Sequence, residues 1–91
     1  IYVYTTKGDI IELPKGSTPI DFAYKIHTDI GNTMVGAFVN DEYVPIDYIL
    51  KNKDRVRIVV DDLSFGPRKE WIDKAHTSLA KKKIREFNGN S

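Results

Sequence analysis

The 91-residue sequence contains no cysteine, which excludes a disulfide framework and thiolate metal sites. It also lacks any apolar run approaching the roughly 18 to 20 residues of a membrane-spanning helix, and no segment resembles a cleaved signal. We therefore expect a cytoplasmic protein with no membrane partner.

Motifs for catalysis and metal binding are missing as well. The two histidines, His27 and His76, do not have the spacing of a zinc motif, and the adjacent acidic pairs at 41–42 and 61–62 fall in predicted turns. Neither glycine-rich phosphate-binding pattern is present. We expect no catalytic residues, no metal and no cofactor in this segment.

The composition allows one compact domain and an appendage. The residues are 41% hydrophobic and 30% charged, which is enough for a single core of modest stability. Residues 1–64 carry seven Lys or Arg and ten Asp or Glu, whereas residues 65–91 carry seven and three. The basic end indicates a phosphate or an acidic partner surface, although a run such as 81–83 is more typical of a solvated helix face.

The most informative segment is 16–31, which predicts one capped helix. Thr18 is a good N-cap, Pro19 suits the first helical position, and Asp21 has the spacing of a capping box. Gly31 is predicted to end the helix, which places His27 in its last two turns at the margin of an apolar stripe. That stripe contains Phe22, Ala23, Ile26 and Ile30.

Short strand-like runs surround this helix. They cover residues 2–5, 9–13, 33–39, 43–46 and 54–60, with turns expected at 6–8 and 40–41 and one helical turn at 47–50. The order is β, β, α, β, β, turn, β. This order is the pattern of an α+β, ubiquitin-like β-grasp fold, with a mixed sheet of about five strands and one crossing helix.

From Pro67 onward the sequence predicts a second, basic amphipathic helix. Its apolar positions recur every three or four residues: Ile72, Ala75, His76, Leu79, Ala80, Ile84 and Phe87. We expect residues 1–62 to form the β-grasp domain and 63–91 to form a linker and this helix, with its apolar stripe docked against another domain. The start without Met and the tail at 88–91 suggest a regulatory segment of a longer protein.

Spacing alone leaves the role of His27 open. A structural histidine would pack its ring against Tyr24 or Ile20, and spacing favours that interpretation. A binding histidine near a helix end would offer a ring nitrogen to a hydroxyl or phosphate and a flat face to a base. Tyr24, like the tyrosines at 43 and 48, is either the edge of the core or a stacking surface, and the core edge is commoner. His76 is expected to be a packing residue.

Longer motifs carry a resemblance that covers nearly the whole chain. The segments Tyr4-Thr-Thr-Lys-Gly-Asp9, Leu13 to Tyr24 and Ile26-His-Thr-Asp-Ile-Gly31 closely resemble the TGS domain of the RelA/SpoT family. Residues 35–37, 44–46 and 50–54 are similar to the rest of that domain. Residues 66–71, 77–78 and 83–85 are similar to the helix that follows it.

The resemblance implies a parent enzyme that makes, and often hydrolyses, (p)ppGpp with catalytic domains outside this segment. It also implies that the domain grips the CCA end of uncharged tRNA on the ribosome, with His27 at the terminal adenosine and Tyr24, Thr28 and Asn32 beside it. The domain would distinguish uncharged from aminoacylated tRNA by exclusion, because a group packed against the free 2′ and 3′ hydroxyls leaves no space for an esterified amino acid.

The sequence departs from the family pattern at three places: Thr6, Lys69 and the segment 32–34. The loop beside His27 is less basic than in many members, so we expect weak binding of isolated tRNA, with the ribosome and neighbouring domains supplying further contacts. An alternative function is a protein-interaction module that binds an acidic partner such as acyl carrier protein or controls the catalytic domains. Its basic partner surface would be Arg55, Arg57, Arg68 and Lys69.

Overall fold

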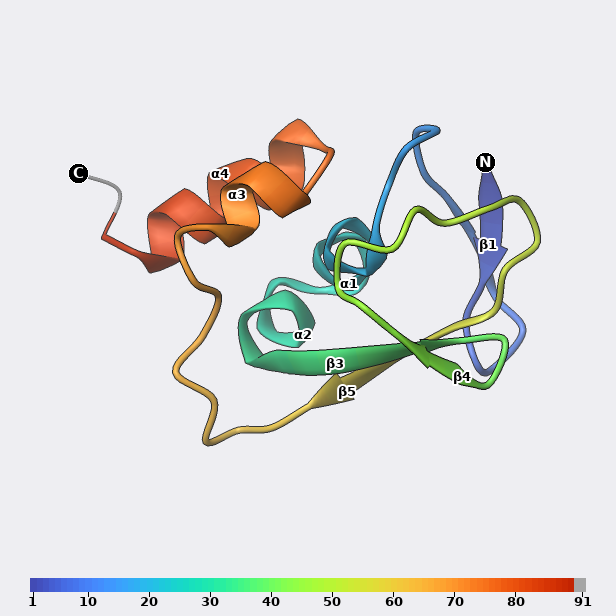
Figure 1. The fold of residues 1–91 in the computed structure, drawn as a ribbon, viewed down its shortest axis with the longest axis horizontal. Coiled ribbons are helices and arrows are strands. Elements are labelled where there is room, and N and C mark those ends of the chain that lie inside the picture. The colour runs from blue at the N-terminus through green and yellow to red at the C-terminus, as the bar shows by residue number, and fades with distance from the viewer. Residues whose placement is uncertain (90–91) are drawn as a thin grey trace.

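The computed structural model describes residues 1–89, so the last two residues of the predicted 63–91 segment lie outside it. Within residues 1–89, five strands and four helices form the fold (Figure 1). The strands are β1 (Tyr2–Tyr4), β2 (Ile10–Glu12), β3 (Met34–Val39), β4 (Glu42–Val44) and β5 (Val56–Val60). The helices are α1 (Pro19–Ile26), α2 (Thr28–Thr33), α3 (Trp71–Lys74) and α4 (Ser78–Phe87).

The strands form two hydrogen-bonded groups joined by one parallel contact. β1 pairs with β2, and β3 lies between β4 and β5, all antiparallel. A parallel bridge between Tyr4 and Arg55 connects the groups, and the Tyr4 N–H donates to the Asp54 carbonyl at 2.8 Å. The predicted β-grasp fold with a mixed sheet is therefore confirmed.

Two predicted turns hold the hairpins. Between β1 and β2, the Thr5 N–H donates to the Asp9 carbonyl at 2.9 Å, and Gly8 adopts a φ of 89°. Between β3 and β4, Asn40 and Asp41 have φ values of 52° and 70°, as a two-residue hairpin turn requires. The helical turn predicted at 47–50 is not present. A β-turn over residues 45–48 takes its place, closed by a hydrogen bond from the Tyr48 N–H to the Pro45 carbonyl.

The helix α1 lies between two layers of apolar side chains. Phe22 packs with the sheet in a cluster that also contains Val3, Leu13, Ala37, Val39, Val44, Leu50 and Val56. Ile20, Ala23 and Tyr24 pack on the other side with Met34, Ala75, Ala80 and Ile84. Because both sides of α1 are covered, this helix is the centre of the fold (Figure 1).

The C-terminal segment differs from the prediction in two ways. The single helix expected from Pro67 is two helices, α3 and α4, separated by residues with extended backbone at Ala75 and Thr77. Part of its apolar stripe docks on α1 of this chain, where Ala80 and Ile84 are fully buried, whereas Leu79 and Phe87 stay exposed. Burying a side chain such as Ile84 contributes about 1.5–3 kcal/mol, which favours docking of this part of the stripe within the chain.

Asp21 explains why the second helix is interrupted. Its carboxylate is 1% exposed and accepts the N–H groups of His76 and Thr77 at 2.8–3.0 Å, together with the Thr77 hydroxyl at 2.9 Å. It also accepts the N–H of Thr18 at 2.8 Å, which is the predicted capping-box contact. Thr77 in turn caps α4 by accepting the Ala80 N–H. One carboxylate therefore caps α1 and anchors the start of α4.

His76 is exposed, so the prediction that it packs in the apolar stripe is wrong. Its backbone N–H, and not its ring, makes the contact with Asp21. The ring lies over Gly16, since a Cβ added there would meet His76 Cε1 at 3.2 Å. The change of backbone direction at 75–77 rotates this residue away from the face that Ala80 and Ile84 share.

Candidate functional site

His27 lies between two helices and not within one, so the prediction of a single helix ending at Gly31 is wrong. Its backbone is extended, with φ −169° and ψ 145°, and it is both the C-cap of α1 and the N-cap of α2. The His27 carbonyl accepts the N–H groups of Ile30 and Gly31, which begins the second helix. The chain thus turns a corner at this residue, and we call residues 26–32 the His27 corner.

The His27 side chain is 64% exposed and has a fixed role at the corner. Its Nδ1 accepts the backbone N–H of Asp29 at 3.0 Å, as the side chain of an N-cap residue does. A neutral imidazole with Nδ1 as acceptor carries its proton on Nε2. The ring therefore presents an N–H donor at Nε2, which makes no hydrogen bond within residues 1–89.

Tyr24 supports the corner from inside. The ring is buried in the cluster against α4, and its hydroxyl donates to Asn32 Oδ1 at 2.8 Å. Burial raises the pKa of the Tyr24 hydroxyl above its ordinary value. Gly31 lies against the ring, and a Cβ at that position would overlap it. Tyr24 is therefore a core residue, which agrees with the commoner of the two interpretations. Its hydroxyl fixes the position of the Asn32 side chain.

Thr28 and Asn32 lie four residues apart on α2, so they share one face of this short helix. Both side chains are half-buried. The Asn32 Oδ1 is occupied by Tyr24, and its amide nitrogen donates no hydrogen bond within the described chain. The structure thus places His27, Thr28 and Asn32 in the His27 corner, and Tyr24 contacts Asn32 there from the core.

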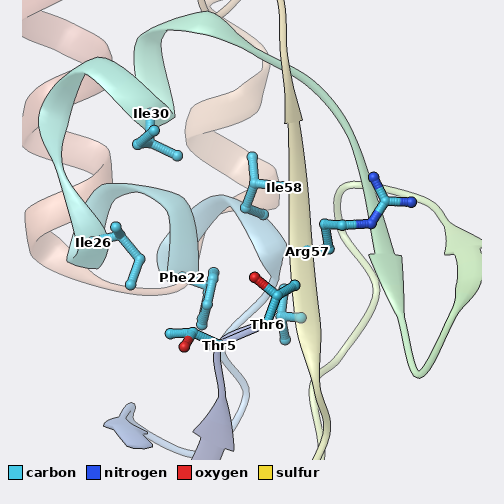
Figure 2. Close-up of a pocket in the computed structure, with 8 residues that line it drawn as sticks. Thr5, Thr6, Phe22, Ile26, Ile30, Arg57 and Ile58 are labelled. Atoms are coloured by element: carbon cyan, nitrogen blue, oxygen red, sulfur yellow. The ribbon is translucent and has the colours of Figure 1, made fainter. Parts of the chain in front are cut away.

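Sequence reasoning missed an apolar groove beside this corner. It has a volume of about 190 Å³ and lies between α1, α2 and β5, as Figure 2 shows. Its lining residues are Thr5, Thr6, Phe22, Ile26, Ile30, Val56, Arg57 and Ile58. The sequence pattern places Ile26 and Ile30 in the buried stripe, but Ile26 is 40% exposed because the helix breaks immediately after it.

The four predicted basic residues come from two separate elements. Arg55 and Arg57 lie before and within β5, and the Arg57 guanidinium stacks 4.2 Å from the centre of the Phe38 ring. Figure 2 shows this guanidinium directed away from the groove, across β5. Arg68 and Lys69 lie in the segment that leads to α3. All four are exposed, and none makes an ion pair within residues 1–89.

None of the helices in residues 1–89 is long and apolar enough to cross a membrane. No group of three or more His, Asp or Glu side chains in the same part of the chain is arranged to hold a metal ion.

Comparison with known proteins gives the family. The TGS domain model matches residues 1–60. The chain is 47% identical over 87 residues to the guanosine-3′,5′-bis(diphosphate) 3′-pyrophosphohydrolase of Aquifex aeolicus, and 46% identical over 87 residues to the GTP pyrophosphokinase of Myxococcus xanthus. It is 41% identical over 88 residues to the bifunctional (p)ppGpp synthase/hydrolase RelA of Mycobacterium tuberculosis.

These similarities cover 96% of this chain but only 11–12% of each relative, so the chain spans about a tenth of their length. The match extends past residue 60 through α3 and into α4, which agrees with the resemblance seen in the sequence. The chain belongs to the TGS domain family, in the form found in proteins of the RelA/SpoT type.

Proposed function

We propose that this chain is the regulatory TGS domain of a cytoplasmic, bacterial RelA/SpoT-type enzyme, and that it recognises the CCA 3′ end of uncharged tRNA on the ribosome. The observation that carries the proposal is the state of His27. Its ring is exposed, its orientation is fixed through Nδ1 by the Asp29 N–H, and its Nε2–H donor is unused. A fixed, unused donor on a surface corner suits recognition of a hydroxyl oxygen.

The terminal ribose of uncharged tRNA supplies two such hydroxyls. An Nε2–H donor set against the 2′ or 3′ oxygen stabilises the free end. An amino acid esterified at the same oxygen fills the space between the ribose and the ring, so the charged tRNA is rejected by a clash. Discrimination then depends on the position of one ring, which explains why the ring is held by a hydrogen bond to the backbone.

The apolar groove next to the corner offers a surface for the terminal base. Ile26 precedes His27 directly, and both Ile26 and Ile30 line the groove. An adenine ring packed on these side chains removes apolar surface from water without reading its edge. In this proposal the groove supplies affinity for either form of the 3′ end, whereas His27 supplies the preference for the free end.

The other predicted residues position this surface. Tyr24 acts from the core by holding Asn32 through its hydroxyl. Asn32 and Thr28 offer an amide nitrogen and a hydroxyl on the same face of α2, where the phosphates of the CCA end would pass. The sheet portion is acidic overall, so most of the phosphate contacts would come from the ribosome and neighbouring domains.

Catalysis in the parent protein is assigned to domains outside this chain. The relatives are named for synthesis and hydrolysis of guanosine polyphosphates. We propose the same class of activity for the parent. The part assigned to the present chain is to report the charge state of tRNA to those domains.

The test is a titration of this chain with an acceptor minihelix ending in CCA, with a free or an aminoacylated 3′ end. At low salt the free end should bind about tenfold more tightly than the aminoacylated end. A His27→Asn variant is the matched probe, because asparagine is also a good N-cap and keeps α2 capped. It should lose the preference for the free end. Equal binding of both ends by the unaltered chain would contradict the proposal.

A second candidate function rests on the outer face of the sheet. Tyr43 is 66% exposed there and meets the Phe38 ring edge-on at 5.3 Å, while Arg57 covers the same ring. Aromatic side chains beside unpaired arginines are typical of protein interfaces. An acidic partner such as acyl carrier protein would bind this face, and neighbouring catalytic domains are the other candidates.

Arg57→Ala separates the two functions. It should weaken binding of an acidic protein partner at the outer sheet face without changing the preference for a free tRNA end. Arg55→Ala provides a second test of the same face. A loss of acyl carrier protein binding on substitution of His27, with no effect of Arg57, would contradict this second candidate.

A further inference from the structure

A second hollow lies at the other end of β5, away from the parallel bridge with β1. It has a volume of about 400 Å³ and is formed by the start of β3, the loop 61–66 and α3. In Figure 1 this loop runs from the end of β5 to α3. The lining side chains that matter here are Phe65, Arg68, Glu70, Trp71 and Lys74. Its volume falls within the range of about 300–1,000 Å³ typical of small-molecule sites.

The loop that carries Phe65 is held in a defined conformation. Asp61 accepts the Leu63 N–H through its carboxylate and the Ser64 N–H through its carbonyl, both at 2.9 Å. The Gly66 N–H donates to Ser64 Oγ at 3.0 Å, and Gly66 has a φ of 90°. The Phe87 ring of α4 lies against Gly66. Hydrogen bonds at Asp61 and the contact between Phe87 and Gly66 therefore hold both ends of the loop 61–66.

Despite these contacts, Phe65 is 99% exposed. Exposure of a large aromatic side chain forgoes the stabilisation that its burial would bring. Trp71, on α3, packs against the cluster formed with α4 and is half-buried. Two aromatic side chains from different elements thus line one open hollow.

The charges of the hollow point to the ligand class. Arg68 and Lys74 line it, both are exposed, and neither makes an ion pair in the described part of the chain. Glu70 is the one acidic residue among the lining residues. Two unpaired cations beside two aromatic rings suit a ligand in which a flat aromatic ring is joined to an anionic group.

We propose that this hollow is a nucleotide-binding site, in which the base stacks on Trp71 and Phe65 and the phosphate is held by Arg68 and Lys74. The same chemistry is present in a free nucleotide and in an unpaired nucleotide of RNA. An apolar peptide would leave both cations without a counter-charge, and an acidic peptide would leave the two aromatic rings without a planar partner. The nucleotide uses all four side chains.

Trp71 makes the site directly observable, because it is the only tryptophan in the sequence. Its fluorescence should fall in a saturable manner when guanosine 5′-monophosphate is added to this chain. Guanosine without phosphate and ribose 5-phosphate without a base should each bind at least about tenfold more weakly. A single-stranded RNA hexamer forms a separate arm. Tighter binding of the hexamer than of the mononucleotide identifies RNA as the source, and the reverse identifies a free nucleotide.

Arg68 and Lys69 form a matched pair of variants. Arg68 lines the hollow whereas Lys69, the next residue, does not, and both side chains are exposed. Arg68→Ala should weaken binding about tenfold, while Lys69→Ala should leave it within about twofold. Phe65→Ala should weaken binding of guanosine 5′-monophosphate, because one stacking surface is lost.

Three results would overturn the proposal. The first is the absence of saturable quenching by both the mononucleotide and the hexamer up to about 1 mM. The second is an equal loss of binding in Arg68→Ala and Lys69→Ala, which would indicate general attraction to the basic segment. The third is binding of guanosine 5′-monophosphate by both single variants, Phe65→Ala and Arg68→Ala, as tightly as by the unaltered chain. Circular dichroism of each variant verifies that the fold is retained.

Discussion

The two ends of α1 carry polar residues that are used in opposite ways. Asp21, in the first turn, is buried, and its carboxylate accepts hydrogen bonds from Thr18, His76 and Thr77. His27, the C-cap residue at the other end, is exposed, and within residues 1–89 only one of its two ring nitrogens makes a hydrogen bond. Both residues cap helices. The hydrogen-bonding capacity of Asp21 is filled by the protein, whereas that of His27 is filled only in part.

This difference separates a structural residue from a binding residue. Every acceptor position that Asp21 offers is directed at the chain itself, and removal of the carboxylate would leave backbone N–H groups buried without a partner. The Nε2–H of His27 is directed at nothing in the described chain and remains available to a ligand. The comparison predicts that substitutions at the two ends separate stability from binding.

Asp21→Ala should give the largest change in stability. Three backbone N–H groups and two hydroxyls lose their acceptor, so the free energy of unfolding should fall by about 3 kcal/mol or more. Urea denaturation followed by circular dichroism measures this change. The loss is a large fraction of the stability expected for a domain of this size.

Two controls accompany this variant. Asp29→Ala removes a side chain that is 85% exposed, and it should change stability by no more than about 0.5 kcal/mol. Thr77→Ala removes one partner of Asp21 and the cap of α4, and it should cost about 1–2 kcal/mol while the chain still folds. An Asp21→Ala variant as stable as Asp29→Ala would refute the structural role of Asp21.

Gly31→Ala should have the next largest effect. A Cβ at this position overlaps the Tyr24 ring, which is 3% exposed and cannot move freely. Overpacking of this kind costs about 1–3 kcal/mol. Thermal unfolding measures the loss, and an unchanged unfolding midpoint would contradict the close packing of Gly31 against the Tyr24 ring.

Tyr24→Phe tests how the core supports the corner. The loss of the hydrogen bond to Asn32 should cost about 1 kcal/mol at neutral pH. Burial raises the pKa of the folded-state hydroxyl above the unfolded value of 10.0, so the unfolded chain releases the proton first as pH rises. The unaltered chain should therefore lose stability above about pH 10, and Tyr24→Phe should lose less over the same range. Urea midpoints at pH 8 and pH 11 compare the two; parallel losses would contradict the buried hydroxyl.

His27→Asn should have the smallest effect on stability, within about 0.5 kcal/mol, because asparagine retains a side-chain cap for α2. The variant should nevertheless lose all discrimination between free and aminoacylated 3′ ends. The same protein sample serves for urea denaturation and for the minihelix titration. A variant that loses stability as strongly as Asp21→Ala would place His27 among the structural residues.

Much of the fold was predictable because its signals are local. The capping box at Thr18 and Asp21, the Asn40-Asp41 turn and the strand patterns each depend on neighbouring residues, and the structure confirms them. The break at His27 and the interruption before Thr77 were not predictable from periodicity. At each break a side chain accepts a hydrogen bond from a backbone N–H. At the first break the acceptor is His27 itself, whereas at the second it is Asp21, which is 55 residues away from His76 in the sequence.

The candidate site was predictable only in part for the same reason. The resemblance selected His27, and the structure adds the orientation of its ring and the groove at Ile26 and Ile30. Ile26 looked like a core residue because the helical periodicity continued through it. The hollow at Phe65 and Trp71 depends on how the loop 61–66 folds back toward α3, and short-range patterns carry no information on that.

Recognition of the tRNA 3′ end at the His27 corner is tested most sharply by locating that end on the protein. A minihelix whose terminal adenosine carries a photoreactive azide would be crosslinked to this chain, and the modified peptide would be identified by mass spectrometry. We expect crosslinks within residues 26–32, and their loss when the 3′ end is aminoacylated. Crosslinks concentrated on Arg55 and Arg57 at the outer sheet face, unchanged by aminoacylation, would contradict it.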